Sequence, residues 1–301
     1  MFKPDDEKVQ QALKPHLRFL EEAGTDMQLL SPRPYTLMHH EKPDKIVHWY
    51  VESCNSLIAS QCRMHPKKFK GVAALPQSVG TDIKHSLPEL ERCVNELGFV
   101  GCLVNPDPGA RGDDSTPAMG DEYWYPLYEK LVELDVPCMI HSSTCLSSRL
   151  SYTLHFINEE SIAIVSLLNS RVFEDFPKLK IVVAHGGGYV SHYPARMDHV
   201  WNAREDARTL LKKSPRRSLA KLYFDTIVFD RAQLQHLVNL WGSDHVVVGT
   251  DYPYDMGWYD PRGFVDGCAF LEDGDRAKIL GLNAAKLLKL KRPAVKTSAK
   301  R

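Results

Sequence analysis

Seven short apolar runs recur along this chain, and an amphipathic stretch follows most of them. The runs are rich in β-branched residues and do not alternate with polar ones; they lie at 27–30, 71–75, 99–104, 136–140, 180–184, 222–225 and 246–249. Such runs are typical of strands buried on both faces of a parallel sheet. Helical patterns lie between them, for example at 83–97, 124–134, 162–173, 233–240 and 276–288. The alternation predicts an α/β fold in which helices wrap a parallel sheet.

Polar and titratable residues follow the apolar runs, and this placement favours closure of the sheet into a (β/α)8 TIM barrel. In that fold the carboxyl ends of all strands converge on one face, where active sites lie. An open sheet would spread the same ends along a line. The residues in question are Ser31, Arg33, Gln77, Asn105, Asp107, His141, His185, Asp225 and Asp251.

The expected barrel is one strand short. The first element that can be recognised is a helix at about 6–23, which leads into the run at 27–30, so nothing supplies a first strand. We therefore expect a single domain over 1–290, a TIM barrel that lacks its first β-strand. Residues 291–301 are basic, contain no apolar run, and are expected to form a disordered tail.

Composition narrows the function and the location. The 38 basic residues balance the 38 acidic ones among 301 residues, so no overall charge attracts nucleic acid or anionic lipid. No run reaches the 18 to 20 apolar residues of a membrane span, and the charged N-terminus does not resemble a signal peptide. The seven cysteines show no CxxC spacing and fit reduced thiols. We expect a cytoplasmic protein without nucleic-acid or membrane partners.

Three strand-end residues indicate metal chemistry when they are taken together. A lone histidine such as His141 is more often a hydrogen-bonded cap, and the glycine turn after His185 is common on its own. A carboxylate at Asp251 would be buried and would need a cation or several donors. Two imidazoles and one carboxylate at separate strand ends of one barrel suit a divalent ion such as Zn²⁺.

These motifs carry a resemblance to a known family. His141, the His185-Gly-Gly-Gly turn and Gly249-Thr-Asp251-Tyr-Pro resemble the amidohydrolase superfamily, in the branch of aminocarboxymuconate semialdehyde decarboxylase, over about residues 8–290. The segment from Glu89 through the Asn105-Pro-Asp-Pro-Gly motif and on to His141 is similar to 4-oxalomesaconate hydratases. The segment from His185 to Pro253 looks more like the decarboxylases.

The resemblance implies a role for each of several residues. His141 and Asp251 would hold a divalent metal, Zn²⁺ or alternatively Mn²⁺, and Asp251 would also take part in catalysis. His185 would be the acid/base beside metal-bound water. A small carboxylic-acid substrate would contact Arg33, Asn105 and Arg196, the last in some members across a subunit interface, which implies a homodimer.

The chain departs from the family at the metal site. Members of the family carry two further ligands as a His-x-His pair on the first strand, and no His-x-His occurs here. His39 and His40 are adjacent, so their side chains diverge and are a poor substitute. The candidate explanations are a truncated chain start, a strand supplied by a partner, and a true metal-less relative; we favour the first. The absent strand would also leave two unpaired sheet edges.

On these grounds we expect a metal-dependent lyase that decarboxylates a small unsaturated or aromatic carboxylic acid. A hydratase of the 4-oxalomesaconate type is the alternative, because the same groups could add water across a double bond. Amide or lactone hydrolysis and a non-catalytic, metal-less scaffold stay open as further alternatives.

Overall fold

The computed structural model describes residues 3–111, 115–143, 146, 152–208, 211 and 213–290. Seven strands lie within them, one for each predicted apolar run. They are β1 (Gln28–Leu30), β2 (Phe69–Gly71), β3 (Cys102–Val104), β4 (Cys138–Ile140), β5 (Ile181–Val183), β6 (Tyr223–Asp225) and β7 (Val246–Val247). The basic segment 291–301, predicted to be a disordered tail, lies outside the described residues.

Every strand pair is parallel, and the strands follow one another in chain order. β1 pairs with β2, and β3 to β7 form a second sheet in the order β3-β4-β5-β6-β7. Ala73 joins the two sheets, because its N–H donates to Gly101 O and its own carbonyl accepts from Leu103 N, both at 2.8 Å. The strand β2, at Phe69–Gly71, begins two residues before the run predicted at 71–75. The arrangement is a TIM-barrel type of fold with β1 and β7 at its two ends.

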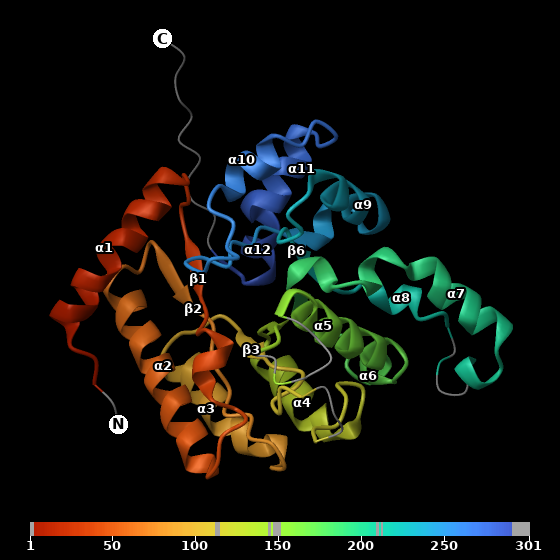
Figure 1. Ribbon diagram of the computed structural model, residues 1–301, viewed down its shortest axis with the longest axis horizontal. Helices are drawn as coiled ribbons and strands as arrows, with labels where there is room; N and C mark the ends of the chain where they lie inside the picture. Colours follow the sequence, from red (N-terminus) through yellow and green to blue (C-terminus); the bar gives the residue numbers. More distant parts are fainter. Residues whose placement is uncertain are drawn as a thin grey trace.

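Helices of different length separate the strands and form the outer layer (Figure 1). They are α1 (Asp6–Glu22), α2 (Asp44–Met64), α3 (Leu87–Glu91), α4 (Tyr125–Leu134), α5 (Tyr152–Leu168), α6 (Val172–Asp175), α7 (Pro194–Ala203), α8 (Arg216–Leu219), α9 (Arg231–Trp241), α10 (Pro261–Asp266), α11 (Asp273–Ala277) and α12 (Asn283–Leu287). The predicted helix at 83–97 is divided into a 3-10 turn, α3 and a π-helical turn at Arg92–Glu96. Long helices and strand positions were therefore well predicted, and helix boundaries less so.

The main core lies between the sheet and this helical layer. In register, Cys102 pairs with Cys138 and Cys138 with Ile181, so these side chains point to the same side. They belong to one buried cluster with Trp124 and Leu167 from the covering helices. Burying this apolar surface is the main stabilising term, at about 25 cal/mol per Å². Cys93, Cys102 and Cys138 are buried and free, in agreement with the reduced thiols expected from the cysteine spacing.

The two ends of the strand order are closed by different means. At β7 the side chain of Asn283 donates to Val246 O at 2.7 Å, and Val248 N donates to Ile279 O at 3.1 Å, so the segment around α12 covers that edge. Beside β1, Gln28 Nε2 donates to Thr250 Oγ1 at 3.2 Å. Among the described residues, side chains thus connect β1 to the segment after β7.

An aromatic contact strengthens that connection. Phe19 of α1 stacks on Tyr252, which follows β7, with ring centroids 3.8 Å apart and planes 3° apart. His16 of α1 lies 4.9 Å from the same tyrosine ring and is 2.7 Å from Gln28 Oε1. Figure 1 places α1 beside β1, with the blue segment after β7 reaching toward them. The first helix is therefore part of the closure.

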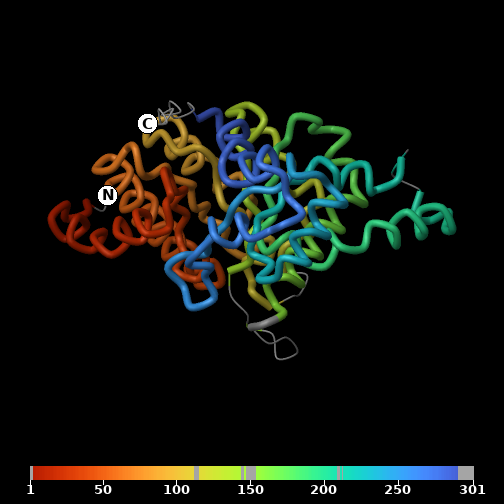
Figure 2. The backbone as a smooth tube through the Cα atoms, turned by 90° about the horizontal axis from the view of Figure 1, so that it is seen from above, coloured from red at the N-terminus to blue at the C-terminus, as the bar shows by residue number. Residues whose placement is uncertain are grey.

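One part of the chain projects from the body of the molecule. α7 and α8 extend away from the helical layer on the side opposite α1, as both views indicate (Figures 1 and 2). Tyr193 and Val200 at α7 are exposed, with 63% and 36% of their surface accessible. Within the described residues, no helix has the length and apolar character needed to cross a membrane.

Candidate active site at the strand ends

The candidate site lies where β4 to β7 end. His141 directly follows β4, and His185 lies two residues after β5. Their rings meet edge to face with centroids 5.0 Å apart, so the structure brings together two of the residues that the sequence singled out. The parallel register is the cause: His141 N donates to Val104 O and Ala184 N to Ile140 O, which continues the strand ladder to this point.

Glu160 of α5 holds the His185 ring. Nδ1 of His185 lies 2.8 Å from Oε1 and 3.0 Å from Oε2 of this carboxylate, which is fully buried. A buried carboxylate is costly unless it is paired, and the imidazole supplies the partner. With Nδ1 committed to Glu160, Nε2 is the ring nitrogen left for a ligand.

The glycine turn after His185 is required by close packing. His185 itself has a positive φ of 50°, and Gly186, Gly187 and Gly188 follow with φ of 62°, 79° and 60°. A Cβ at Gly188 would lie 2.4 Å from Ile157 O of α5, so no larger residue fits. The turn brings His185 against α5, where it reaches Glu160.

Asp225, the last residue of β6, is hydrogen-bonded to the backbone of this turn. Its Oδ1 accepts from Gly186 N at 2.9 Å and from Ile227 N at 3.1 Å, and only 3% of the residue is exposed. Burial raises the pKa of Asp225, while these donors and His185 oppose that rise. The carboxylate fixes the backbone that carries His185.

The pKa values of His141 and His185 are shifted in opposite directions. Burial, together with the charge of His185, lowers the pKa of His141 to about 4. Burial would also lower the pKa of His185, but neighbouring carboxylates, above all Glu160, outweigh it and raise the pKa to about 9. The site therefore places a neutral imidazole beside a protonated one.

Asp251 completes the group on the side of β7. It has a positive φ of 51°, and its charge acts on both His141 and His185, which places it near both rings. His141, His185 and Asp251 thus converge on one site, although their roles in it stay predictions.

Asn105 belongs to a buried hydrogen-bond network at the end of β3. Its side-chain N–H groups donate to His39 Nδ1 at 3.1 Å and Ser143 Oγ at 2.8 Å, and its Oδ1 accepts from Asp107 N. His39 in turn donates from Nε2 to Leu75 O at 2.9 Å. Every polar atom of the Asn105 amide thus has a protein partner, so the geometry favours positioning Ser143, two residues after His141, over direct contact with substrate.

The two predicted substrate arginines lie in different places. Arg33, just after β1, is exposed and lies over the Tyr254 ring at 4.6 Å, close to Asp251 in the chain. Arg196 is exposed on α7, in the projecting part of the molecule. Within one chain the structure brings Arg33, and not Arg196, to the strand-end site.

The residues present only partly fit a divalent metal ion. His141 donates from Nδ1 to Ser142 O at 2.6 Å, which leaves Nε2 as a ligand, and Asp251 offers a carboxylate. Zinc sites need three or four protein ligands, however. Among the residues that the structure describes, no group of three or more candidate ligands is close enough to hold an ion. The described residues therefore do not form a complete metal site, and the ring of His39 is engaged elsewhere.

Glu160 is the residue that sequence analysis missed. It lies in the Asn158-Glu-Glu-Ser161 stretch, ahead of the predicted helix at 162–173, whereas α5 begins at Tyr152. The available signal was a pair of acidic residues next to a strongly apolar helix, since such charges are buried only when they have a partner.

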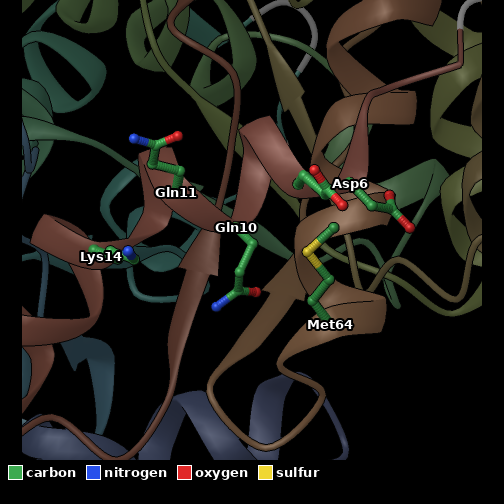
Figure 3. Close-up of a pocket in the computed structure, with 6 residues that line it drawn as sticks. Asp6, Gln10, Gln11, Lys14 and Met64 are labelled. Atoms are coloured by element: carbon green, nitrogen blue, oxygen red, sulfur yellow. The ribbon is translucent and has the colours of Figure 1, made fainter.

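A hollow elsewhere on the surface is separate from this site. It is lined by Asp6, Gln10, Gln11, Lys14 and Met64, from α1 and the end of α2 (Figure 3). It shares no residue with the strand-end site, and its Asp6 is paired with Arg63 at 2.9 Å.

Parallel strands wrapped by helices, with acid/base residues at the strand ends, define a barrel-type α/β enzyme. The amidohydrolase family model matches residues 5–290, and the chain belongs to that family. It is 35% identical over 260 residues to the 2-keto-4-carboxy-3-hexenedioate hydratase of Sphingobium sp. strain SYK-6, covering 85% of this chain and 74% of the relative.

Decarboxylases are similar to the chain as well. The 2-amino-3-carboxymuconate-6-semialdehyde decarboxylase of Dictyostelium discoideum is 29% identical over 278 residues, covering 90% of this chain and 75% of the relative. The crystal structure of a dihydroxybenzoic acid decarboxylase from Polaromonas sp. JS666, with bound manganese and the inhibitor 2-nitroresorcinol, superposes with a TM-score of 0.81 at 26% identity. The superposition covers 93% of this chain and 86% of the decarboxylase chain.

The buried network around His39 predicts acid sensitivity. Burial lowers the pKa of His39 to about 4, below its usual 6.5, so unfolding takes up a proton as the pH falls from about 6.5 to about 4. As the pH falls from about 6.5 to about 4, His39 should therefore lower the free energy of unfolding by about 3 kcal/mol. Above pH 6.5 it should have no such effect. Urea unfolding at pH 7 and pH 4.5 measures the loss. In His39→Gln the loss between pH 7 and pH 4.5 should be smaller than in the wild type by about 2 kcal/mol. The control His85→Gln, at an exposed histidine, should show the wild-type loss. Equal losses in all three proteins would contradict the prediction.

Proposed function

We propose that this protein is a carboxy-lyase that removes CO2 from a small unsaturated or aromatic carboxylic acid. The observation that carries the proposal is the His185–Glu160 pair, in ring contact with His141 at the strand ends. Decarboxylase relatives that cover most of the chain support the same reaction class.

The chemistry follows from the free nitrogen of His185. Breaking the bond to the carboxylate releases CO2 and leaves its electron pair on carbon, where a proton must be added. His185, oriented by Glu160, gives that proton from Nε2. Arg33 holds a carboxylate at the rim of the site, and Asn105 orients Ser143 beside His141.

Hydration is the second candidate, and one specific observation favours it. The hydratase from Sphingobium shares 35% identity over 85% of this chain. The same imidazole can give a proton to one carbon of a double bond while water adds to the other. The two reactions differ in product, so a single assay separates them.

We further propose Zn²⁺, with Mn²⁺ as the other choice, as a cofactor bound through His141 and Asp251. The manganese-containing decarboxylase is the support from related structures. Two ligands do not complete a site, so the proton transfer described above depends only on residues of this chain. A cytoplasmic location fits the six free cysteines among the described residues.

The acid/base role predicts a large loss of activity. His185→Gln should lower kcat by about 10²- to 10⁴-fold, because it removes the proton donor. The assay follows CO2 release and ultraviolet absorbance with 2,6-dihydroxybenzoate and 2-keto-4-carboxy-3-hexenedioate, with Mn²⁺ or Zn²⁺ added. His85→Gln is the control and should keep wild-type turnover. Absence of both CO2 and a hydration product from the wild type would sink the proposal.

The metal proposal predicts a weak, specific site. Mn²⁺ titrated into the protein should bind at one site, and His141→Ala or Asp251→Ala should weaken binding at least about 10-fold. Elemental analysis and the paramagnetic relaxation of water measure binding without any turnover. Equal affinity in the wild type and both variants would remove these residues from the metal site.

We propose a homodimer that uses the exposed apolar surfaces of α5 and α7. Ile162 of α5 is 49% exposed, and Tyr193 before α7 is 63% exposed. α5 is apolar around most of its circumference, which is typical of a helix covered on all sides. We propose that Arg196, which is exposed on α7, lies at this interface and reaches the partner's site.

Light scattering at micromolar concentration should therefore give twice the 34.1 kDa chain mass. Ile162→Glu should shift the protein to monomer, because it buries a charge in the interface. Leu57→Glu, at an exposed position of α2, should leave the dimer intact. A monomeric wild type would refute the assembly.

A further inference from the structure

Two tyrosine rings flank the Arg33 guanidinium at the rim of the candidate site. Its central carbon lies 4.6 Å from the Tyr254 ring centroid and 5.7 Å from that of Tyr35. Arg33 follows β1, whereas Tyr254 follows β7, so the contact spans the two ends of the strand order. Stacking on an aromatic face is favourable for a guanidinium and leaves its N–H donors free.

Arg33 has no acidic partner within the described part of the chain, although many of the other arginines there are in ion pairs. The residue is exposed, and an arginine side chain without a fixed neighbour samples many rotamers. The rings of Tyr254 and Tyr35 restrict that freedom without neutralising the charge. An oriented, unpaired guanidinium is a binding group for a carboxylate, which it contacts through two parallel hydrogen bonds.

The turn that carries Tyr254 also carries Asp251. Tyr254 N donates to Asp251 O at 3.1 Å, and Trp258 N donates back to Thr250 O at 2.7 Å. The hydroxyl of Tyr259 donates to Pro253 O at 2.9 Å. These bonds make residues 250–259 one compact unit, so the position of the Tyr254 ring is tied to that of Asp251.

We propose that Tyr254 is a positioning residue that holds Arg33 as the carboxylate-binding group, and that the 250–259 turn sets the position of that carboxylate relative to His185 and Asp251. The ligand is then a planar, unsaturated acid with one carboxylate at the rim and its reacting carbon near His185. This inference rests on the proposed function for the location of the chemistry, but the Arg33–Tyr254 contact stands independently of it.

The order of the Arg33 side chain tests the contact directly. In protein labelled with ¹⁵N-arginine, the Nε–H signal of Arg33 is assigned by its loss in Arg33→Lys, and its order parameter is measured. Tyr254→Leu should lower the order parameter to a value typical of an exposed arginine, whereas Tyr254→Phe keeps the ring and should preserve it. Tyr50→Leu, at an exposed tyrosine of α2, is the matched control.

Ligand binding tests the carboxylate assignment. 2,6-Dihydroxybenzoate and fumarate are titrated while the Arg33 signal is followed, with resorcinol as the analogue that lacks a carboxylate. At least one acid should shift the signal, and Tyr254→Leu should weaken its binding about 5- to 10-fold while Tyr254→Phe stays within about twofold of the wild type. Resorcinol should leave the signal unchanged.

The outcomes separate the two proposals. An Arg33 order parameter that is equal in the wild type and Tyr254→Leu would overturn the positioning role; Tyr254→Met gives the same comparison if the leucine variant does not fold. A signal that neither acid shifts would overturn the carboxylate assignment. A signal shifted by either acid, together with neither CO2 nor a hydration product in the assay described above, would support this inference and overturn the proposed function.

Discussion

The parallel register of the strands determines where every candidate functional group lies. Each described strand has only two or three residues, yet the pairing puts Val104, Ile140 and Val183 at one level. The next residues along each segment must then stand at one rim. His141, His185, Asp225 and Asp251 meet for this reason, although the first and the last are 110 positions apart in the chain. A shift of one residue in any pair would turn the functional side chains toward the helices.

Burial gives this rim its chemical character. Glu160 and Asp225 are almost inaccessible to water, and each is compensated differently: the first by an imidazole and the second by two backbone N–H groups. Replacing such a buried pair by apolar residues is often neutral or stabilising, so stability alone is weak grounds for keeping it. Strongly perturbed groups with a specific partner at a strand end are typical of a functional site. Arg33 supplies the opposite charge at the same rim, and no carboxylate among the described residues pairs with it.

How far the sequence predicted this arrangement depends on the range of the interaction. Apolar runs report local burial, so all seven strands and the strand-end residues could be predicted. Glu160 was missed, because its role depends on a contact with His185, 25 positions away, and the polar stretch before Ile162 concealed the start of α5. Asn105 was correctly placed at the end of its strand, but nothing local reveals that His39 and Ser143 engage its amide. The short strand at Phe69–Gly71 was predicted too late because Val72 to Leu75 are just as buried as the strand itself.

The stack of Phe19 on Tyr252 gives the first helix an influence on chemistry at the far end of the chain. Helix α1 leads directly into β1, and its aromatic side chain lies against the residue next to Asp251. Proteins open locally in contiguous units, at free energies up to that of global unfolding. Each such opening of α1 withdraws the ring that supports Tyr252 and frees the turn behind it. Assembly of the site is therefore coupled to the docking of α1, a segment that contributes no reacting group.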